Sequence, residues 1–156
     1  MEKKTNLPPT ILFIFGGSGD LANRKLIPAL YNLFLNDQLP EKFMVIGVGR
    51  TAFPDVNEYR DKLRDVIKQF SRRKENLEEK WASFAPMISY HEMDLTSDEA
   101  YRKMTAWIGE KNKEWGVNPN VIFYLAVAPQ LAPSIAKKLS AQKICDDTQH
   151  TRIVFE

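Results

Sequence analysis

Cysteine and histidine are both scarce in this sequence of 156 residues, and their scarcity excludes several kinds of site. A single cysteine, Cys145, makes an intramolecular disulfide impossible and leaves no set of thiolates to bind a metal. The two histidines, His91 and His150, lie far apart in the chain, and no acidic cluster at ligand spacing accompanies them. We therefore expect no metal site, and we interpret His150 as part of a polar surface turn rather than as a general base.

An excess of one charge and a long apolar run are also missing. The 22 Lys and Arg residues nearly balance the 20 Asp and Glu residues, so the net charge of +2 does not indicate binding to nucleic acid or to a membrane surface. No apolar run approaches the roughly 18 residues of a membrane span. The first one, Ile11 to Phe15, is too short for a signal sequence. We expect a cytoplasmic protein with no nucleic-acid or membrane partner.

What the sequence does have is an ordinary globular composition, with 44% hydrophobic and 27% charged residues over a length suited to one domain. Short β-branched and aromatic runs predict strands at Thr10–Phe15, Phe43–Val48, Met87–His91, Val121–Ala126 and Arg152–Phe155. Between them, helices are predicted from the first glycine turn to Phe34 with a kink at Pro28, over Asp55–Lys74, from Thr96 or Ser97 to Trp115, and from Pro133 or Ser134 to Lys143. This alternation predicts an α/β fold of the Rossmann type, a doubly wound, mainly parallel sheet with helices on both faces, in one domain over residues 1–156.

Glycine is sparse, with 7 residues, yet three of them fall within positions 16–19, directly after the first predicted strand. The turn reads Gly16-Gly17-Ser18-Gly19-Asp20-Leu21-Ala22, a variant of the dinucleotide-binding fingerprint with small residues at positions 16, 19 and 22. Gly16 permits a sharp exit from the strand, and Gly19 leaves room for a pyrophosphate beside the backbone. We predict that residues 16–21 bind the pyrophosphate of a dinucleotide. The alternative is a flavodoxin-like or phosphate-binding domain without a dinucleotide.

The residues after the second predicted strand indicate which dinucleotide is bound. An NAD site usually has an acidic residue there to accept hydrogen bonds from the ribose, but this strand is followed by Arg50 and Thr51. A guanidinium forms a bidentate, charge-assisted pair with a phosphate, and the Thr51 hydroxyl adds a weaker donor. We therefore predict that the cofactor is NADP, with Arg50 at its 2′-phosphate. The alternative is a solvated loop arginine.

Two further segments follow predicted strands at the same edge of the sheet. Asp94 and Leu95 come after the third strand and could contact the adenine, although a turn leading into the next helix explains them equally well. Ala126 and Pro129 come after the fourth strand, where the backbone could line the nicotinamide half of the cofactor. The three tryptophans are better explained by core packing than by stacking on a ligand; they are Trp81, Trp107 and Trp115.

Several of these motifs together resemble the N-terminal signature of the glucose-6-phosphate dehydrogenase family. They are the turn from Phe15 to Ala22, the run from Arg24 to Tyr31, Gly47-Val48-Gly49-Arg50, Phe123 to Ala126 with Pro129, and the final Arg152-Ile153-Val154-Phe155-Glu156. They occur in the order found in the family and extend from about Thr10 to the last residue. Taken together they are far more specific than the glycine turn alone.

The resemblance implies an activity and a cofactor. Members of the family oxidise the C1 hydroxyl of glucose 6-phosphate to 6-phosphogluconolactone and pass the hydride to NADP+, the entry step of the oxidative pentose phosphate pathway. By position, Arg50 takes the role of the family arginine at the 2′-phosphate. Lys25, in the basic run after the glycine turn, is expected near the cofactor.

The resemblance also implies what this sequence does not contain. The family pattern continues beyond the final glutamate into a Lys-Pro-Phe-Gly run whose lysine helps to bind substrate, and this sequence stops at Glu156. The catalytic histidine and the domain that forms the dimer interface lie further on in the family, and neither His91 nor His150 matches the catalytic position. We therefore expect an NADP(H)-binding domain without catalytic residues, inactive alone, from a protein that is a homo-oligomer at full length. The alternative is a stand-alone NADP-binding sensor or interaction module.

Overall fold

Five parallel strands form one sheet in the computed structural model, which describes residues 7–19, 22–71, 73 and 77–155. The strands are β1 (Thr10–Phe15), β2 (Phe43–Gly49), β3 (Ile88–Glu92), β4 (Asn120–Leu125) and β5 (Thr151–Phe155). Their spatial order is β3-β2-β1-β4-β5, and every neighbouring pair is parallel. A doubly wound sheet of the Rossmann type has the strand order 3-2-1-4-5-6, and these are its first five strands. The predicted fold class is therefore confirmed.

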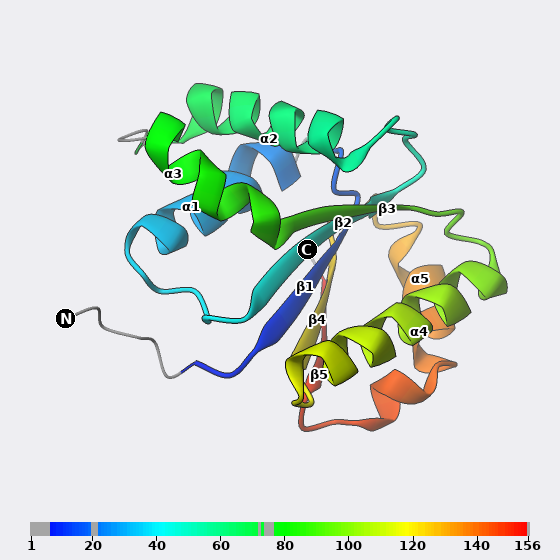
Figure 1. Ribbon diagram of the computed structural model, residues 1–156. Helices are drawn as coiled ribbons and strands as arrows, with labels where there is room; N and C mark the ends of the chain where they lie inside the picture. The colour runs from blue at the N-terminus through cyan, green and yellow to red at the C-terminus, as the bar shows by residue number, and fades with distance from the viewer. Residues whose placement is uncertain (1–6, 20–21, 72, 74–76, 156) are drawn as a thin grey trace.

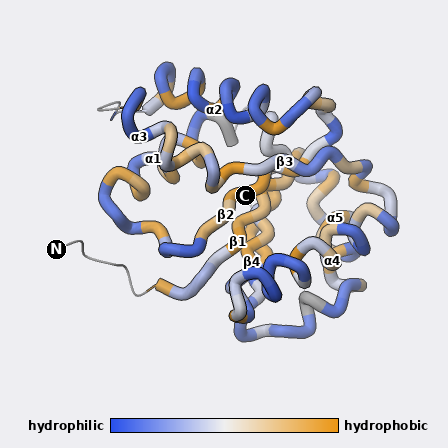
Figure 2. Tube along the Cα trace, in the orientation of Figure 1, coloured by the Kyte–Doolittle hydropathy of each residue, from blue (hydrophilic) through white to orange (hydrophobic). Residues whose placement is uncertain are grey.

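Helices cover both faces of this sheet, as Figure 1 shows. One face carries α1 (Ile27–Leu35), α2 (Val56–Phe70) and α3 (Leu77–Phe84), and the other carries α4 (Asp98–Trp115) and α5 (Ala132–Ser140). Three short segments complete the order, the π-helical turn η1 (Ala22–Leu26) and the 3₁₀ turns η2 (Ala85–Met87) and η3 (Lys143–Asp146). Hydrophobic residues gather on the strands between the two helical layers (Figure 2).

The central strand β1 explains why the apolar run at the start of the sequence is nearly continuous. Phe13 and Phe15 pack toward α4 and α5, whereas Ile14 packs toward α1, α2 and α3, and all three side chains are fully buried. A strand covered on both faces needs apolar side chains at successive positions rather than at alternate ones. The predicted bounds of this strand are confirmed.

The helix boundaries follow from local capping. The Asp55 side chain accepts hydrogen bonds from the amides of Asn57 and Glu58 at 2.7 and 3.2 Å, so α2 begins at the next residue after Asp55. Ser97 caps α4 in the same way, and Gly116 ends it in the left-handed region at φ +69°. These predicted ends are confirmed.

Three helical predictions differ from the structure. The helix predicted to reach Lys143 ends at Ser140, and Lys143 begins the separate turn η3. The helix predicted to reach Lys74 ends at Phe70, because Ser71 is extended and its hydroxyl bonds to the Arg73 carbonyl at 2.7 Å; the separate helix α3 was not predicted. The break expected at Pro28 falls just before it, where η1 gives way to α1. Pro28 then lies in the first turn of α1, where a missing amide donor costs nothing.

The three tryptophans are partly buried and pack against the core, as predicted. Trp81 packs against the cluster under α1 to α3, and Trp107 and Trp115 pack against the cluster under α4 and α5. The Trp107 ring meets the edge of Phe13 at a centroid distance of 5.9 Å. All three rings thus have packing partners within the protein.

Candidate functional site

The strand order reverses between β1 and β4, and the loops that leave the carboxyl ends of these strands meet there. From β1 the chain moves to β2 and β3 on one side, and it later returns to β4 and β5 on the other. The amide of Ala126, just after β4, donates to the carbonyl of Phe15 at 2.9 Å, which holds the two strand ends together. In open α/β sheets, ligands bind in the crevice at such a reversal.

The glycine turn after β1 needs glycine for reasons of space as well as conformation. Gly16 has φ +86°, and a Cβ added to it would lie 2.3 Å from the carbonyl oxygen of Ala126. A Cβ at Gly17 would lie 2.6 Å from the Cα of Gly47, so a side chain at either position would collide with backbone. The turn therefore lies flat against the ends of β2 and β4. It forms a cradle that a larger residue would fill, as a pyrophosphate site requires.

The amides of the three glycines already have partners within the protein. Gly16 and Gly17 donate to the carbonyl of Val48 at 2.8 and 3.3 Å, and Gly19 donates to the carbonyl of Gly16 at 2.8 Å. These bonds fix the shape of the turn. Of the other positions in the predicted pyrophosphate site, Asp20 and Leu21 lie outside the described residues.

The structure brings the glycine turn next to the loop after β2. The hydroxyl oxygens of Ser18 and Thr51 are 3.1 Å apart, although the two residues are separated by 33 positions in sequence. Arg50 is exposed beside them and makes no hydrogen bond or ion pair with the residues the structure describes. It lines a cavity of about 440 Å³ together with Glu92, Met93 and Asp94. The two hydroxyls and the residue that carries the guanidinium thus lie at the same edge of the sheet.

Three residues that the sequence did not single out support this arrangement. The Tyr59 hydroxyl donates to the carbonyl of Gly17 at 3.1 Å, and the Lys62 ammonium donates to the carbonyl of Ser18 at 3.3 Å. The Tyr90 hydroxyl donates to the carbonyl of Thr51 at 2.8 Å. Tyr59 belongs to a predicted helix and Tyr90 to a predicted strand. Nothing in their spacing indicated that their hydroxyl groups reach the turn and the loop.

Burial and charge shift several pKa values around the site. Desolvation raises the pKa of Tyr59 and of Tyr90, so both phenols stay protonated and remain donors at neutral pH. The pKa of Asp94 is lowered, first by hydrogen bonds from the Thr96 side chain and amide and also by the charges of Arg50 and Lys138. The Asp94 carboxylate is therefore ionised, near Arg50, at the rim of the cavity.

The other residues predicted to contact the cofactor lie on η1, in the turn after β3 and in the turn after β4. Lys25, on η1, is exposed and makes no hydrogen bond or ion pair with the described residues. Asp94 accepts from the Thr96 amide at 2.9 Å in a turn that leads toward α4, and the Leu95 side chain packs against the core. Pro129 is exposed in a turn closed by the bond from the Leu131 amide to the Ala128 carbonyl.

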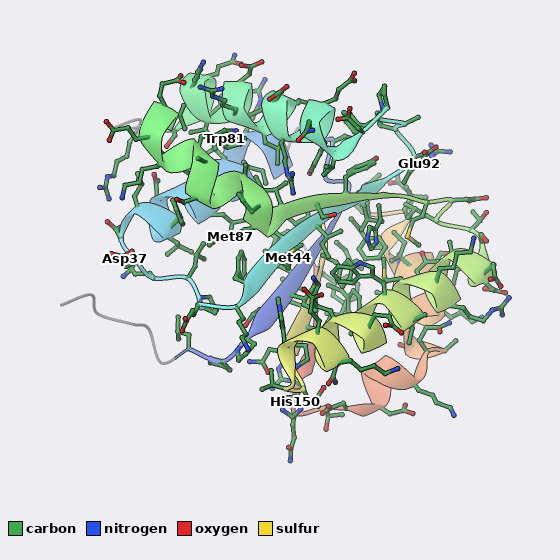
Figure 3. The ribbon with its side chains drawn as sticks, in the orientation of Figure 1. Asp37, Met44, Trp81, Met87, Glu92 and His150 are labelled. Atoms are coloured by element: carbon green, nitrogen blue, oxygen red, sulfur yellow. The ribbon has the colours of Figure 1, made fainter. Side chains whose placement is uncertain are left out.

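The two histidines lie at opposite ends of the sheet, His91 near the end of β3 and His150 just before β5. His91 lies against Phe13 and Trp107, at centroid distances of 6.1 and 5.1 Å, and burial lowers its pKa. His150 bonds to Asp147 at 2.9 Å and precedes β5, so it lies at the amino ends of the strands. Figure 3 shows it at the end of the molecule opposite Glu92. The interpretation of His150 as part of a turn agrees with this position.

Among the residues that the structure describes, no group of three or more His, Cys, Asp or Glu side chains is arranged to hold a metal ion. No helix in the described part of the chain has the length and apolar character needed to cross a membrane.

Comparisons with known proteins identify relatives along nearly the whole chain. Residues 13–156 match the family described as "Glucose-6-phosphate dehydrogenase, NAD binding domain". The chain is 34% identical to the glucose-6-phosphate 1-dehydrogenase of Leuconostoc mesenteroides over 147 residues, covering 94% of this chain and 29% of that protein. It is 32% identical to the enzyme of Bacillus subtilis over 154 residues, covering 98% of this chain and 30% of that protein.

Solved structures agree with these matches. The chain superposes with a TM-score of 0.77 and 29% identity on a glucose-6-phosphate dehydrogenase solved in complex with glucose 6-phosphate, covering 99% of this chain and 31% of that one. The enzyme from Mycobacterium avium gives the same TM-score at 26% identity, covering 95% of this chain and 29% of that one. The chain thus spans about 30% of the length of the relatives that it matches.

Proposed function

The chain belongs to the glucose-6-phosphate dehydrogenase family, matching its nucleotide-binding domain, and we propose that it binds NADP(H) at the edge where the glycine turn meets the Arg50 loop. The pyrophosphate lies over the cradle of Gly16 and Gly17. The ribose phosphate lies between Arg50 and the hydroxyls of Ser18 and Thr51. The cavity beside Asp94 receives the adenine.

The observation that carries this proposal is the 3.1 Å contact between the Ser18 and Thr51 hydroxyls, with Arg50 exposed next to it. β2 ends at Gly49 and is followed by a cation, where an NAD site usually has a carboxylate that bonds to the ribose hydroxyls. A phosphate there would receive two hydroxyl donors and a guanidinium. Hydrogen bonds to charged groups contribute about 1.5–3 kcal/mol each, enough for a preference of at least about tenfold for NADPH over NADH.

The pyrophosphate contacts are proposed on the space that the glycines leave. Since the amides of Gly16, Gly17 and Gly19 already donate to carbonyls within the protein, these glycines contribute space rather than donors to the pyrophosphate. Lys25, four positions after Leu21, adds a positive charge nearby. Ala126 and Pro129, beyond the end of β4, line the nicotinamide half of the site.

We extend the proposal to the reaction of the whole protein. NADP+ held at this site would supply the acceptor for the hydride that members of the family remove from C1 of glucose 6-phosphate. A base is needed to take the proton from the C1 hydroxyl. Among the described residues, His91 packs against Phe13 and Trp107, and His150 bonds to Asp147. Both lie away from the proposed nicotinamide side. The base and the sugar-phosphate contacts are therefore assigned to the part of the family's length that this chain does not match, as are the homo-oligomer contacts. The proposed setting is the oxidative pentose phosphate pathway in the cytoplasm.

Fluorescence titration of the chain with NADPH and with NADH tests the nucleotide assignment. We expect tighter binding of NADPH, and Arg50→Ala should weaken NADPH binding at least about tenfold while changing NADH binding less than about threefold. Lys113→Ala is the matched control, since Lys113 is an exposed cation about 24 Å along α4 from its capping residue Ser97. Equal affinity for the two nucleotides, or an Arg50→Ala variant that behaves like the control, would refute the proposal.

A second measurement tests whether this chain alone catalyses the reaction. The chain incubated with glucose 6-phosphate and NADP+ should form no NADPH above the rate without protein. Catalysis by this chain alone would show that the base lies within it and would overturn that part of the proposal.

A further inference from the structure

Two tyrosines, Tyr59 of α2 and Tyr90 of β3, fill the space that Gly47 leaves on β2. Gly47 pairs with Tyr90 in the parallel register, and a Cβ on Gly47 would lie 2.1 Å from the Tyr59 hydroxyl and 3.1 Å from the Tyr90 ring. The two rings pack at a centroid distance of 4.7 Å, and Phe53 contacts both, at 5.2 and 4.8 Å. The rings are therefore held by packing, and their hydroxyl groups have defined positions.

These two hydroxyls reach different parts of the nucleotide site. Tyr59 donates to Gly17, in the glycine turn, at 3.1 Å. Tyr90 donates to Thr51, in the loop that carries Arg50, at 2.8 Å. The glycine turn serves any dinucleotide, whereas the Arg50 loop serves only a nucleotide with a 2′-phosphate. The two tyrosines thus support functions that can be measured separately.

We propose that Tyr90 is a positioning residue that determines specificity for the 2′-phosphate, by holding the Arg50–Thr51 loop against the glycine turn. This inference rests on the proposed NADP(H) function and deepens it. Tyr90 acts through Thr51 and Arg50.

The surroundings of the Tyr90 hydroxyl support this role. A Cβ added to Gly49 would lie 3.2 Å from the Tyr90 hydroxyl and 3.7 Å from the Ser18 hydroxyl, so the phenol lies over the end of β2, close to both loops. The Ser18 and Thr51 hydroxyls are 3.1 Å apart, so all three hydroxyls form one group at the end of β2. The raised pKa keeps the phenol neutral, so it donates to the Thr51 carbonyl and brings no negative charge toward a phosphate.

The test compares two variants that each lose one phenolic hydroxyl. Tyr90→Phe should weaken NADPH binding by about 3- to 10-fold, the range for loss of one hydrogen bond, and NADH binding by less than about twofold. Tyr59→Phe should weaken both nucleotides by the same factor, leaving their ratio unchanged. A Tyr90→Phe variant that leaves the NADPH to NADH ratio unchanged would overturn the inference. A Tyr59→Phe variant that shifts the ratio as far would do the same.

A second variant perturbs the same hydroxyl while keeping it. Gly49→Ala brings a methyl group against the Tyr90 phenol and should lower the NADPH to NADH ratio in the same direction as Tyr90→Phe. If Tyr90→Phe loses its helical circular dichroism and therefore does not fold, Gly49→Ala still tests the inference. In the double variant Arg50→Ala/Tyr90→Phe, the loss of the ratio caused by Tyr90→Phe should be smaller than in the wild-type background, because only the Thr51 hydroxyl is left to position. Independent, additive losses would overturn the inference.

The wild-type chain and Arg50→Ala separate failure of this inference from failure of the proposed function. If wild type does not prefer NADPH, the proposed function fails. If wild type prefers NADPH and Arg50→Ala removes the preference while Tyr90→Phe and Gly49→Ala keep it, the inference about Tyr90 alone is wrong.

Discussion

Replacing Gly16 by alanine should damage the protein for two separable reasons, one conformational and one steric. The residue has φ +86°, where an L-amino acid costs about 1–2 kcal/mol. Its new Cβ would lie 2.3 Å from the carbonyl oxygen of Ala126, and overpacking of this kind typically costs about 1–3 kcal/mol more. Because that oxygen belongs to the backbone next to β4, no flexible side chain can move aside. We expect Gly16→Ala to lower the free energy of unfolding by about 2–5 kcal/mol.

Two other glycines of the same chain separate these contributions. Gly116 also has positive φ, at +69°, but a Cβ there would meet nothing within 4 Å, so Gly116→Ala should show the conformational cost alone, about 1 kcal/mol. Gly109 lies inside α4 with open space around it, so Gly109→Ala should stabilise the protein by up to about 1 kcal/mol.

Urea unfolding followed by far-ultraviolet circular dichroism measures all three variants on one scale. The reasoning predicts the order Gly109→Ala, Gly116→Ala, Gly16→Ala from most to least stable. A Gly16→Ala variant no less stable than Gly116→Ala would refute the steric part, since it would show that the turn moves away from β4 at no cost. A variant as stable as Gly109→Ala would refute both parts.

Three further predictions concern capping, charge and pH. Asp55→Ala removes the acceptor for two amides at the start of α2 and should cost about 1 kcal/mol in urea unfolding, whereas Asp55→Asn should cost much less; equal losses would contradict the capping role. Asp94→Asn keeps an oxygen for the Thr96 amide but removes a negative charge near Arg50, so NADPH should bind up to about threefold more tightly and NADH should be unaffected. Burial lowers the pKa of His91 below its unfolded value of about 6.5, so the unfolded state binds more protons in that range and stability falls as pH drops through and below it. His91→Phe should flatten the loss of stability between about pH 7 and 5, and an unchanged slope would show that other groups cause it.

The fold class was predictable because the pattern and the packing agree. The run from Thr10 to Phe15 is apolar at successive positions, and the structure buries it from both sides in the centre of the sheet. Asp55, Ser97 and Gly116 mark helix ends by local chemistry, which needs no knowledge of the rest of the chain. The separate helix α3 was not predicted, because no sequence signal marks a boundary between its eight residues and the charged, helix-favouring region before them. The break at Ser71 depends on a bond to the Arg73 carbonyl that has no sequence signature.

The candidate site was predictable in part for the same reason. Gly16 was recognised from a local pattern, because a strand that ends in a tight turn needs a residue that tolerates positive φ. Arg50 was recognised from its place after the second strand. The sequence did not predict that the Ser18 and Thr51 hydroxyls lie 3.1 Å apart. Nor did it predict that the Tyr59 and Tyr90 hydroxyls donate to the backbone of the glycine turn and of the Arg50 loop.

By itself, the sequence determined the alternation of strands and helices, the glycine turn, and the arginine in the place of an acidic residue. These are properties of neighbouring residues, set by side-chain periodicity and by the conformations that glycine allows. Only the tertiary structure decided which hydroxyls meet and which phenol supports which loop. Residues 18 and 51 are brought together by the pairing of β1 with β2, and Tyr90 reaches Thr51 because β3 pairs with β2 in one particular register. A shift of one residue in that register would turn Tyr90 to the other face of the sheet, and the contact would be lost.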